Sequence, residues 1–256
     1  MIESVHNGFL RKITKSRKST PIYMLHGELG RYPVAVTIKS RMIAFWSRLI
    51  SGDRNKISFR IYNYMLQTRN NNFKWINKIK SILQSAGRNY LWLNQFNGLL
   101  PLNVHRTVKQ TLIDQHIQEW DALLRSSNKS RLYNSVKTDP KLEPYIKLLP
   151  RNDVLTLFKF RTSNHKFPIE TGRWDGTLLA NRHCPLCNTN EIGSEQHYLL
   201  SCTAFTRERN FHLAHLELNI NIANNENCYK SLLNSNSFKD LTRICKLLRI
   251  IMERFR

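Results

Sequence analysis

The chain has 256 residues, 41% of them apolar, which is enough to bury a core in one large or two small domains. Its 40 lysines and arginines outnumber its 18 acids, giving a formal net charge of +22. So large an excess favours a polyanionic partner, nucleic acid first and an anionic membrane surface second. No run approaches the length of apolar residues that a transmembrane helix needs, which argues against membrane insertion.

Cysteine usage and the N-terminus bear on the compartment. Five cysteines, an odd number, and an opening segment without an apolar signal core predict free or metal-bound thiols in a reducing environment. We therefore expect an intracellular protein, in the nucleus, the cytoplasm or both, that is not secreted.

The first part of the chain predicts a basic helical domain over residues 1–125. Residues 1–20 form a short amphipathic segment with a basic run at 15–18, which is most simply a solvated face. Apolar residues at helical spacing predict helices from about 35 to 51, 58 to 67, 73 to 86 and 103 to 124. Trp46 and Trp75 lie on or beside these apolar stripes, so we interpret them as core anchors rather than base-stacking platforms.

Residues 126–150 are polar and then punctuated by prolines, which predicts a linker. The remaining residues, 151–256, form the second predicted domain, with helices beginning near Asn152, Thr203 and Ser237. The last of these has one apolar stripe and a basic face; a helix docked on the core is favoured over one that binds a membrane or RNA. Strand signals are weak, so the predicted fold is all-α, with one short hairpin at the metal site described next.

The most specific pattern in the sequence is a CCHC set. Cys184 and Cys187 are two residues apart, His197 follows after nine more, and Cys202 after four. Three thiols and an imidazole are the closed ligand set of a structural zinc ion, which leaves no position for a catalytic water. The alternative is three ordinary buried thiols and a surface histidine, but polar turn residues surround them. Cys228 and Cys245 lie outside this spacing and are expected to be buried thiols.

The spacing of the last two ligands constrains the local backbone conformation. Five residues along an ideal helix correspond to about 500°, which leaves His197 and Cys202 about 140° apart around the axis. A straight helix therefore cannot direct both at one ion. We expect the turn bearing His197, for which Ser194 is a candidate cap, to bend or end before Cys202, with a new helix over 203–218.

Basic residues flank the cysteine pair in a segment that Pro168 and Gly172 are expected to keep out of regular helix. They are candidates for contacts with nucleic-acid phosphates, although they are equally consistent with a solvated loop. The candidates are Arg161, His165, Lys166, Arg173 and Arg182.

Catalytic signatures are missing from the sequence. The aspartates are scattered, with no two adjacent, whereas polymerases and many nucleases hold two metal ions between clustered carboxylates. Neither a glycine-rich phosphate loop nor a G-x-S-x-G elbow occurs. We predict that the chain is not an enzyme by itself and has no catalytic residues.

Three stretches resemble the C-terminal region of non-LTR (LINE-type) retrotransposon polyproteins, downstream of the reverse transcriptase domain. They are ESVHNGFLRKIT with TPIYMLHGELGRYP behind it, FKFRTSNHKFPIETGRW, and CPLC with EQHYLLSC. The resemblance covers about residues 2–209 and gives Cys184, Cys187, His197 and Cys202 the zinc-ligand roles. It implies a zinc-binding module that assists the handling of template RNA or target DNA.

Two departures from the family pattern limit what the resemblance implies. The paired aspartates of the polymerase are absent, and no Pro-Asp dipeptide of a restriction-like endonuclease follows Cys202. The predicted partners are RNA or DNA, contacted through the backbone, and an upstream reverse transcriptase domain; no membrane and no small-molecule substrate is predicted. Two alternatives stay open: a module that docks on a reverse transcriptase core or host protein, and an inactive relic. The chain is interpreted as a fragment of a longer polyprotein, a truncated copy or an adopted host gene.

Overall fold

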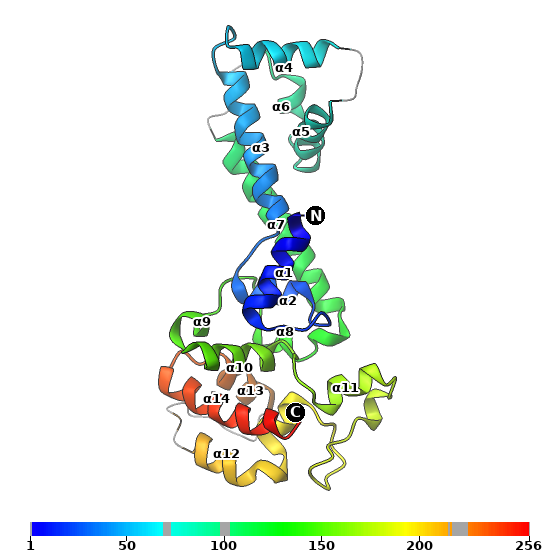
Figure 1. The fold of residues 1–256 in the computed structure, drawn as a ribbon, viewed down its shortest axis with the longest axis vertical. Coiled ribbons are helices and arrows are strands. Elements are labelled where there is room, and N and C mark those ends of the chain that lie inside the picture. Colours follow the sequence, from blue (N-terminus) through cyan, green and yellow to red (C-terminus); the bar gives the residue numbers. More distant parts are fainter. Residues whose placement is uncertain (1, 69–72, 98–102, 215, 217–224, 256) are drawn as a thin grey trace. The chain divides into compact units, whose positions relative to one another are not determined.

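A computed structural model describes residues 2–68, 73–97, 103–214, 216 and 225–255 (Figure 1). Within these ranges the chain is helical and forms no β-strand, which confirms the predicted all-α class. One isolated antiparallel bridge, between His183 and Ile192, lies where the short hairpin was expected. None of the described helices is both long and apolar enough to cross a membrane.

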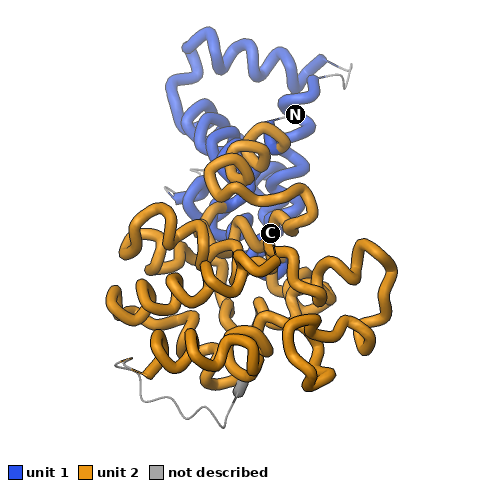
Figure 2. Tube along the Cα trace, turned by 60° about the horizontal axis from the view of Figure 1, so that its bottom comes forward, with its two compact units in different colours: residues 1–3, 32–119 blue, residues 4–31, 120–256 orange. Residues whose placement is uncertain are grey.

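Contacts divide the chain into two compact units, coloured separately in Figure 2. Unit 1 comprises residues 1–3 and 32–119, and unit 2 comprises residues 4–31 and 120–256. This division differs from the predicted one, because residues 4–31 and the predicted linker both belong to the unit that contains the cysteines. The physical reason is burial: Leu25, Tyr133 and Tyr145 lie in one apolar cluster with Phe158.

Unit 1 is built around amphipathic helices that begin and end close to the predicted residues. Its core contains Trp46, which is fully buried and donates its indole N–H to the Tyr62 hydroxyl at 3.1 Å. Tyr62 in turn donates to Gln95 at 2.5 Å, and burial raises the pKa of Tyr62 to about 12. Trp46 is therefore a core anchor, as expected. The helices are α3 (Val34–Ser51), α4 (Ile57–Gln67), α5 (Lys74–Ser85), α6 (Asn89–Leu93) and α7 (Val104–Ser126) to residue 119.

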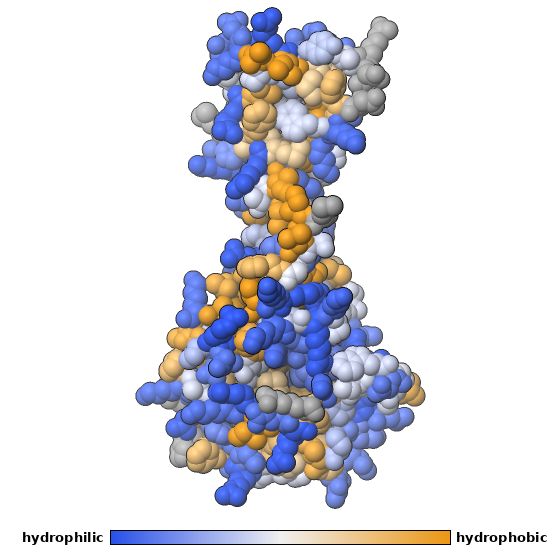
Figure 3. Space-filling model, in the orientation of Figure 1, coloured by the Kyte–Doolittle hydropathy of each residue, from blue (hydrophilic) through white to orange (hydrophobic). Residues whose placement is uncertain are grey.

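Unit 2 is a larger helical assembly with a continuous apolar core. Hydrophilic side chains cover much of the face of this unit seen in Figure 3. Its described helices of four residues or more are α1 (Ile2–Thr14) from residue 4, α2 (Ile22–Leu29), α7 from residue 120, α8 (Tyr133–Val136), α9 (Tyr145–Leu148), α10 (Arg151–Arg161), α11 (Pro168–Trp174), η3 (His197–Ser201), α12 (Thr206–Leu213), α13 (Asn225–Leu233) and α14 (Phe238–Glu253).

Helix α14 is docked on the core, as predicted. The Ser237 side chain accepts a hydrogen bond from the Asp240 amide and caps the helix. Its apolar stripe is fully buried and packs against α10 and α12, and its basic residues lie elsewhere on the helix. The stripe consists of Leu241, Ile244, Leu248 and Ile251.

Two predicted elements need correction. Residues 168–174 form helix α11 rather than an irregular segment, because Pro168 occupies the first turn, where a missing N–H costs nothing. Gly172 fits because the Arg182 side chain packs against it; an added Cβ would come within 2.7 Å. Helix α12 ends at Leu213, earlier than predicted, and residues 215, 217 and 218 of that prediction lie outside the described residues.

Candidate metal centre and basic surfaces

The four predicted ligands converge in unit 2. Sulfur atoms of Cys184, Cys187 and Cys202 and a ring nitrogen of His197 all lie within 4.8 Å of one another. The Cys184 and Cys202 sulfurs are 3.8 Å apart, and the Cys187 sulfur lies 3.4 Å from His197 Nε2. A tetrahedron with the usual zinc–sulfur and zinc–nitrogen bond lengths has edges of about 3.8 and 3.5 Å. These two distances match tetrahedral edges, and the four groups lie close enough together that they could hold one metal ion.

The first two ligands lie on the loop that the single bridge closes. The Cys184 amide donates to the Glu191 carbonyl at 2.8 Å, and the Gly193 amide donates to the Arg182 carbonyl at 2.8 Å. Within the loop the Leu186 amide points at the Cys184 sulfur, 3.4 Å away. This contact stabilises a thiolate, the form in which cysteine binds a metal.

The last two ligands lie on a π-helical turn. Residues 197–201 form it, and the Cys202 amide donates to the His197 carbonyl at 2.8 Å. An i→i+5 hydrogen bond brings residues five apart onto one side of the backbone, which an α-helix does not do. The predicted break before Cys202 therefore takes the form of a π turn. Ser194 caps it, accepting from the His197 amide at 3.2 Å.

A second layer of contacts orients the histidine. Its Nδ1 lies 2.6 Å from Glu191 Oε2, and the Ser201 hydroxyl donates to the same oxygen at 3.0 Å. The hydrogen bond from His197 lowers the pKa of Glu191. A carboxylate on Nδ1 leaves Nε2, the nitrogen facing Cys187, to bind a metal. Sequence spacing did not identify Glu191 or Ser201.

The thiols differ in their environment. Cys184 and Cys202 are buried, whereas Cys187 is partly exposed. Burial raises the pKa of Cys202 to about 12. At Cys187 the effect of burial is outweighed by hydrogen bonds from Thr189 and from the other ligands, which lower its pKa to about 6. Cys228 and Cys245 are buried elsewhere, as predicted.

An aromatic cluster joins the turn that carries His197 to the core. Tyr198, next to His197 and fully buried, has its ring centroid 4.7 Å from that of Phe167 and 4.9 Å from that of Phe255. Phe205, from the segment after Cys202, lies 6.2 Å from Tyr198. The turn that carries two ligands is thus part of the unit 2 core.

Arg161 is not placed to meet a phosphate, which corrects the prediction for this residue. Its side chain is fully buried and contacts Glu28 Oε2 and Glu143 Oε2, each at 3.0 Å. It also donates to Asn234 at 2.7 Å. Burial acts to lower the pKa of Arg161, but Glu28 and Glu143 outweigh it and hold the pKa above the ordinary value. Arg161 therefore ties α2 and the segment before α9 to α10.

His165 is also withdrawn from the surface. Its ring is buried, with Nε2 3.0 Å from Glu195 Oε1, and it stacks on Phe167 with 3.9 Å between centroids. Ser163 donates to the same Glu195 oxygen at 2.6 Å, so serine and histidine both face the carboxylate instead of each other. This arrangement is not that of a catalytic triad, in which the base contacts the nucleophile.

The other three predicted contacts remain near the surface. Lys166 and Arg173 are exposed, whereas Arg182 is half-buried. Arg182 donates to the carbonyls of Ile169 and Thr177, at 2.9 Å each, so it stabilises the segment around α11. These residues border two different depressions of unit 2.

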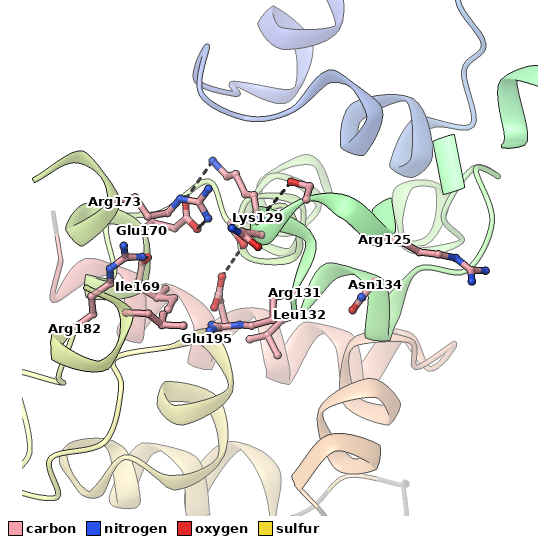
Figure 4. Close-up of a pocket in the computed structure, with 14 residues that line it drawn as sticks. Arg125, Lys129, Arg131, Leu132, Asn134, Ile169, Glu170, Arg173, Arg182 and Glu195 are labelled. Carbon is pink, nitrogen blue, oxygen red and sulfur yellow. Dashed lines mark hydrogen bonds and ion pairs between the residues drawn. The ribbon is translucent and has the colours of Figure 1, made fainter. Parts of the chain in front are cut away.

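The first depression, which we call the basic cavity, has a volume of about 620 Å³. Figure 4 shows Lys129 pointing toward Glu170, with Arg173 beside them. The Lys129 nitrogen lies 3.2 Å from Glu170, and both side chains are nearly buried. Glu195 also lines the cavity, so acidic side chains compensate part of the cavity's positive charge. Its basic lining residues are Arg125, Lys129, Arg131, Arg173 and Arg182.

The second depression, which we call the basic groove, has a volume of about 410 Å³. Unlike the basic cavity, it has no aspartate or glutamate among its described lining residues. Lys166 is one of the phosphate contacts that the sequence predicts, whereas the basic run at 15–18 is predicted only to be a solvated face. The basic residues that line the groove, besides His165, are Lys15, Arg17, Lys159, Lys166 and Arg249.

Comparison of the chain with protein-family models, curated proteins and solved structures gives no match. The candidate metal centre and the two basic depressions are therefore the features that bear on its function.

Proposed function

We propose that the chain is a non-catalytic nucleic-acid-binding module in which one zinc ion stabilises unit 2. By resemblance it corresponds to the C-terminal region of a non-LTR retrotransposon reverse transcriptase, where it assists the handling of template RNA or target DNA. The observation that carries the proposal is the convergence of three thiols and one imidazole within 4.8 Å, in a chain with a net charge of +22.

Zinc is the ion that this ligand set favours. Thiolate and imidazole ligands in a tetrahedral array select zinc over calcium, magnesium or manganese, which prefer oxygen. With four protein ligands the ion has no open position, so its role is structural. Glu191 and Ser201 orient His197 in the way that outer-layer groups do at zinc centres.

The charge supports a nucleic-acid partner. Lysine and arginine side chains that neutralise phosphates release condensed counterions, which makes affinity fall linearly with the logarithm of salt concentration. No carboxylate lies among the described residues that line the basic groove, so its lysines and arginines are suited to such contacts. Contacts of this kind recognise the backbone and carry no sequence preference.

Fluorescence anisotropy with labelled single-stranded RNA, single-stranded DNA and duplex DNA tests the proposal over a range of salt concentrations. We expect binding whose logarithm falls linearly with the logarithm of salt, and weaker binding after zinc is removed by a chelator. Absence of binding at low salt to all three probes would contradict the nucleic-acid function.

One observation favours a docking module as the second candidate. Helix α4 in unit 1 exposes Ile57, Ile61 and Tyr64, by 76%, 53% and 66% of their surfaces. Residues spaced by four and three lie on one face of a helix, so these three side chains form an apolar strip. A strip that docks on a reverse transcriptase domain would show little dependence on salt, in contrast to phosphate binding.

A further inference from the structure

We infer that the basic groove, together with the exposed ring of Trp174, binds single-stranded nucleic acid, with phosphates in the groove and a base stacked on the tryptophan. The inference rests on the proposed function and adds to it the strandedness of the ligand and the place where it binds.

The groove gathers positive charge from segments far apart in the chain. Lys15 and Arg17 follow α1, Lys159 lies on α10, Lys166 precedes α11, and Arg249 lies on α14. Arg249 is held at 2.6 Å by Asp153, which lies outside the described lining of the groove and offsets the charge of this arginine. Like charges around one concavity repel one another unless an anion lies between them, so the groove is suited to a polyanion.

The rest of the lining fits a nucleotide chain better than a free phosphate ion. Leu155, Met252 and Phe255 provide apolar surface, and Asn152, Thr156 and Asn164 provide polar groups. A single strand presents sugars and bases between its phosphates, so it can contact apolar and charged surface at once.

Arg17 links the groove to an aromatic ring. Its guanidinium carbon lies 5.4 Å from the centroid of the Trp174 ring, a cation–π distance. The Arg17 side chain also donates to the His165 carbonyl at 3.4 Å, and the Arg11 side chain donates to the Arg17 carbonyl at 2.6 Å. The arginine is therefore held in place before any ligand arrives.

Trp174 is the candidate stacking surface. It is 54% exposed although tryptophan is among the residues that gain most from burial, and the guanidinium of Arg17 lies over its ring. Base–aromatic stacking tolerates any sequence, because every base has a π face. In a duplex both faces of each base are already stacked, so this contact is available only to single strands or ends.

The test compares variants of the full chain, loaded with zinc, by anisotropy with oligouridylate, oligothymidylate and a duplex of equal length. We expect Trp174→Leu to weaken single-strand binding about 5- to 150-fold, the effect of losing one stacked base, and to leave duplex binding unchanged. Trp174→Phe keeps an aromatic face and should retain most of the affinity.

A charge variant tests the groove independently. Replacing Lys15, Lys159 and Lys166 together by Gln should reduce the salt slope for single strands by about 2, at roughly 0.7 per phosphate contact. The control replaces Lys147, Arg207 and Lys230 by Gln; these are exposed residues of unit 2 that line neither depression. Circular dichroism and zinc content confirm that each variant is folded.

Three outcomes are distinguishable. If the wild-type chain binds none of the probes, the proposed function fails. The inference is overturned, and binding lies elsewhere, if the wild-type chain binds but Trp174→Leu changes the affinity for single strands and duplex equally or changes neither. It is also overturned if the groove variant and the control variant lose the same amount of salt slope. The inference is supported if Trp174→Leu loses affinity for single strands alone and if the salt slope falls in the groove variant but not in the control variant.

Discussion

The Cys202 amide donates a 2.8 Å hydrogen bond to the carbonyl of His197, five residues earlier in the chain. This one π-helical contact settles a conflict between spacing and geometry. An α-helix places residues five apart about 140° from each other, whereas the π turn lets both side chains face Cys184 and Cys187. The extra residue in the turn is therefore what brings His197 and Cys202 together with the two other candidate ligands.

Inserting one alanine after Leu200 should abolish stoichiometric zinc binding. The insertion places His197 and the cysteine six residues apart, about 600° along a helix, so their side chains face directions about 120° apart around the axis. Leu200→Met keeps the register and the apolar side chain and serves as the control. Zinc per chain is measured by mass spectrometry of the purified proteins, and one equivalent of zinc in the insertion variant would contradict the assignment.

Glu191→Ala should weaken zinc binding about 10- to 100-fold, the usual cost of losing an outer-layer partner of a metal-bound histidine. The carboxylate fixes the ring of His197 and its tautomer, so its removal frees the ring to turn. Competition with a chromophoric chelator measures the affinity. Glu226→Ala removes an exposed acid of α13 and should change nothing.

Removal of zinc should expose one thiol before the others. Cys187 is the most exposed of the five cysteines, and its pKa of about 6 makes it mainly thiolate at neutral pH. Burial raises the pKa of Cys228, and raises that of Cys245 to about 12, so both remain protonated thiols. Brief alkylation and peptide mass spectrometry should find Cys187 modified only after chelation. Earlier labelling of Cys228 or Cys245 would contradict this order.

Arg161→Met should destabilise unit 2 by about 3–5 kcal/mol, because it removes the buried cation between the carboxylates of Glu28 and Glu143, of which Glu143 keeps an ion pair with Lys137. Adding Glu28→Gln removes one of those charges and should recover part of the loss. Denaturant unfolding of the zinc-loaded protein gives both free energies. Arg125→Ala, which breaks an exposed pair with Asp121, should cost no more than about 0.5 kcal/mol. Equal costs for the two arginines would show that burial of Arg161 is not decisive.

The sequence predicted those features that depend on local spacing. The CCHC pattern identified the four ligands, and helical periodicity gave α3 and α14 nearly to the residue. Ser194 and Ser237 were found as caps because a cap is a relation between residues three apart.

Features that depend on distant partners were not predictable in this way. Arg161 is of a residue type that commonly contacts phosphate. In the core, however, it is neutralised by Glu28, which lies 133 positions away in the sequence. The same holds for His165 and Glu195. The division into units was missed because residues 4–31 pack on helices far along the chain, and no local signal marks that packing.

X-ray absorption at the zinc edge of the purified chain tests the central claim most directly, together with zinc content. We predict one zinc ion per chain, with three sulfur neighbours at about 2.3 Å and one nitrogen neighbour at about 2.0–2.1 Å. A chain that carries no stoichiometric zinc, or one whose zinc has oxygen neighbours in place of the sulfurs, would contradict it.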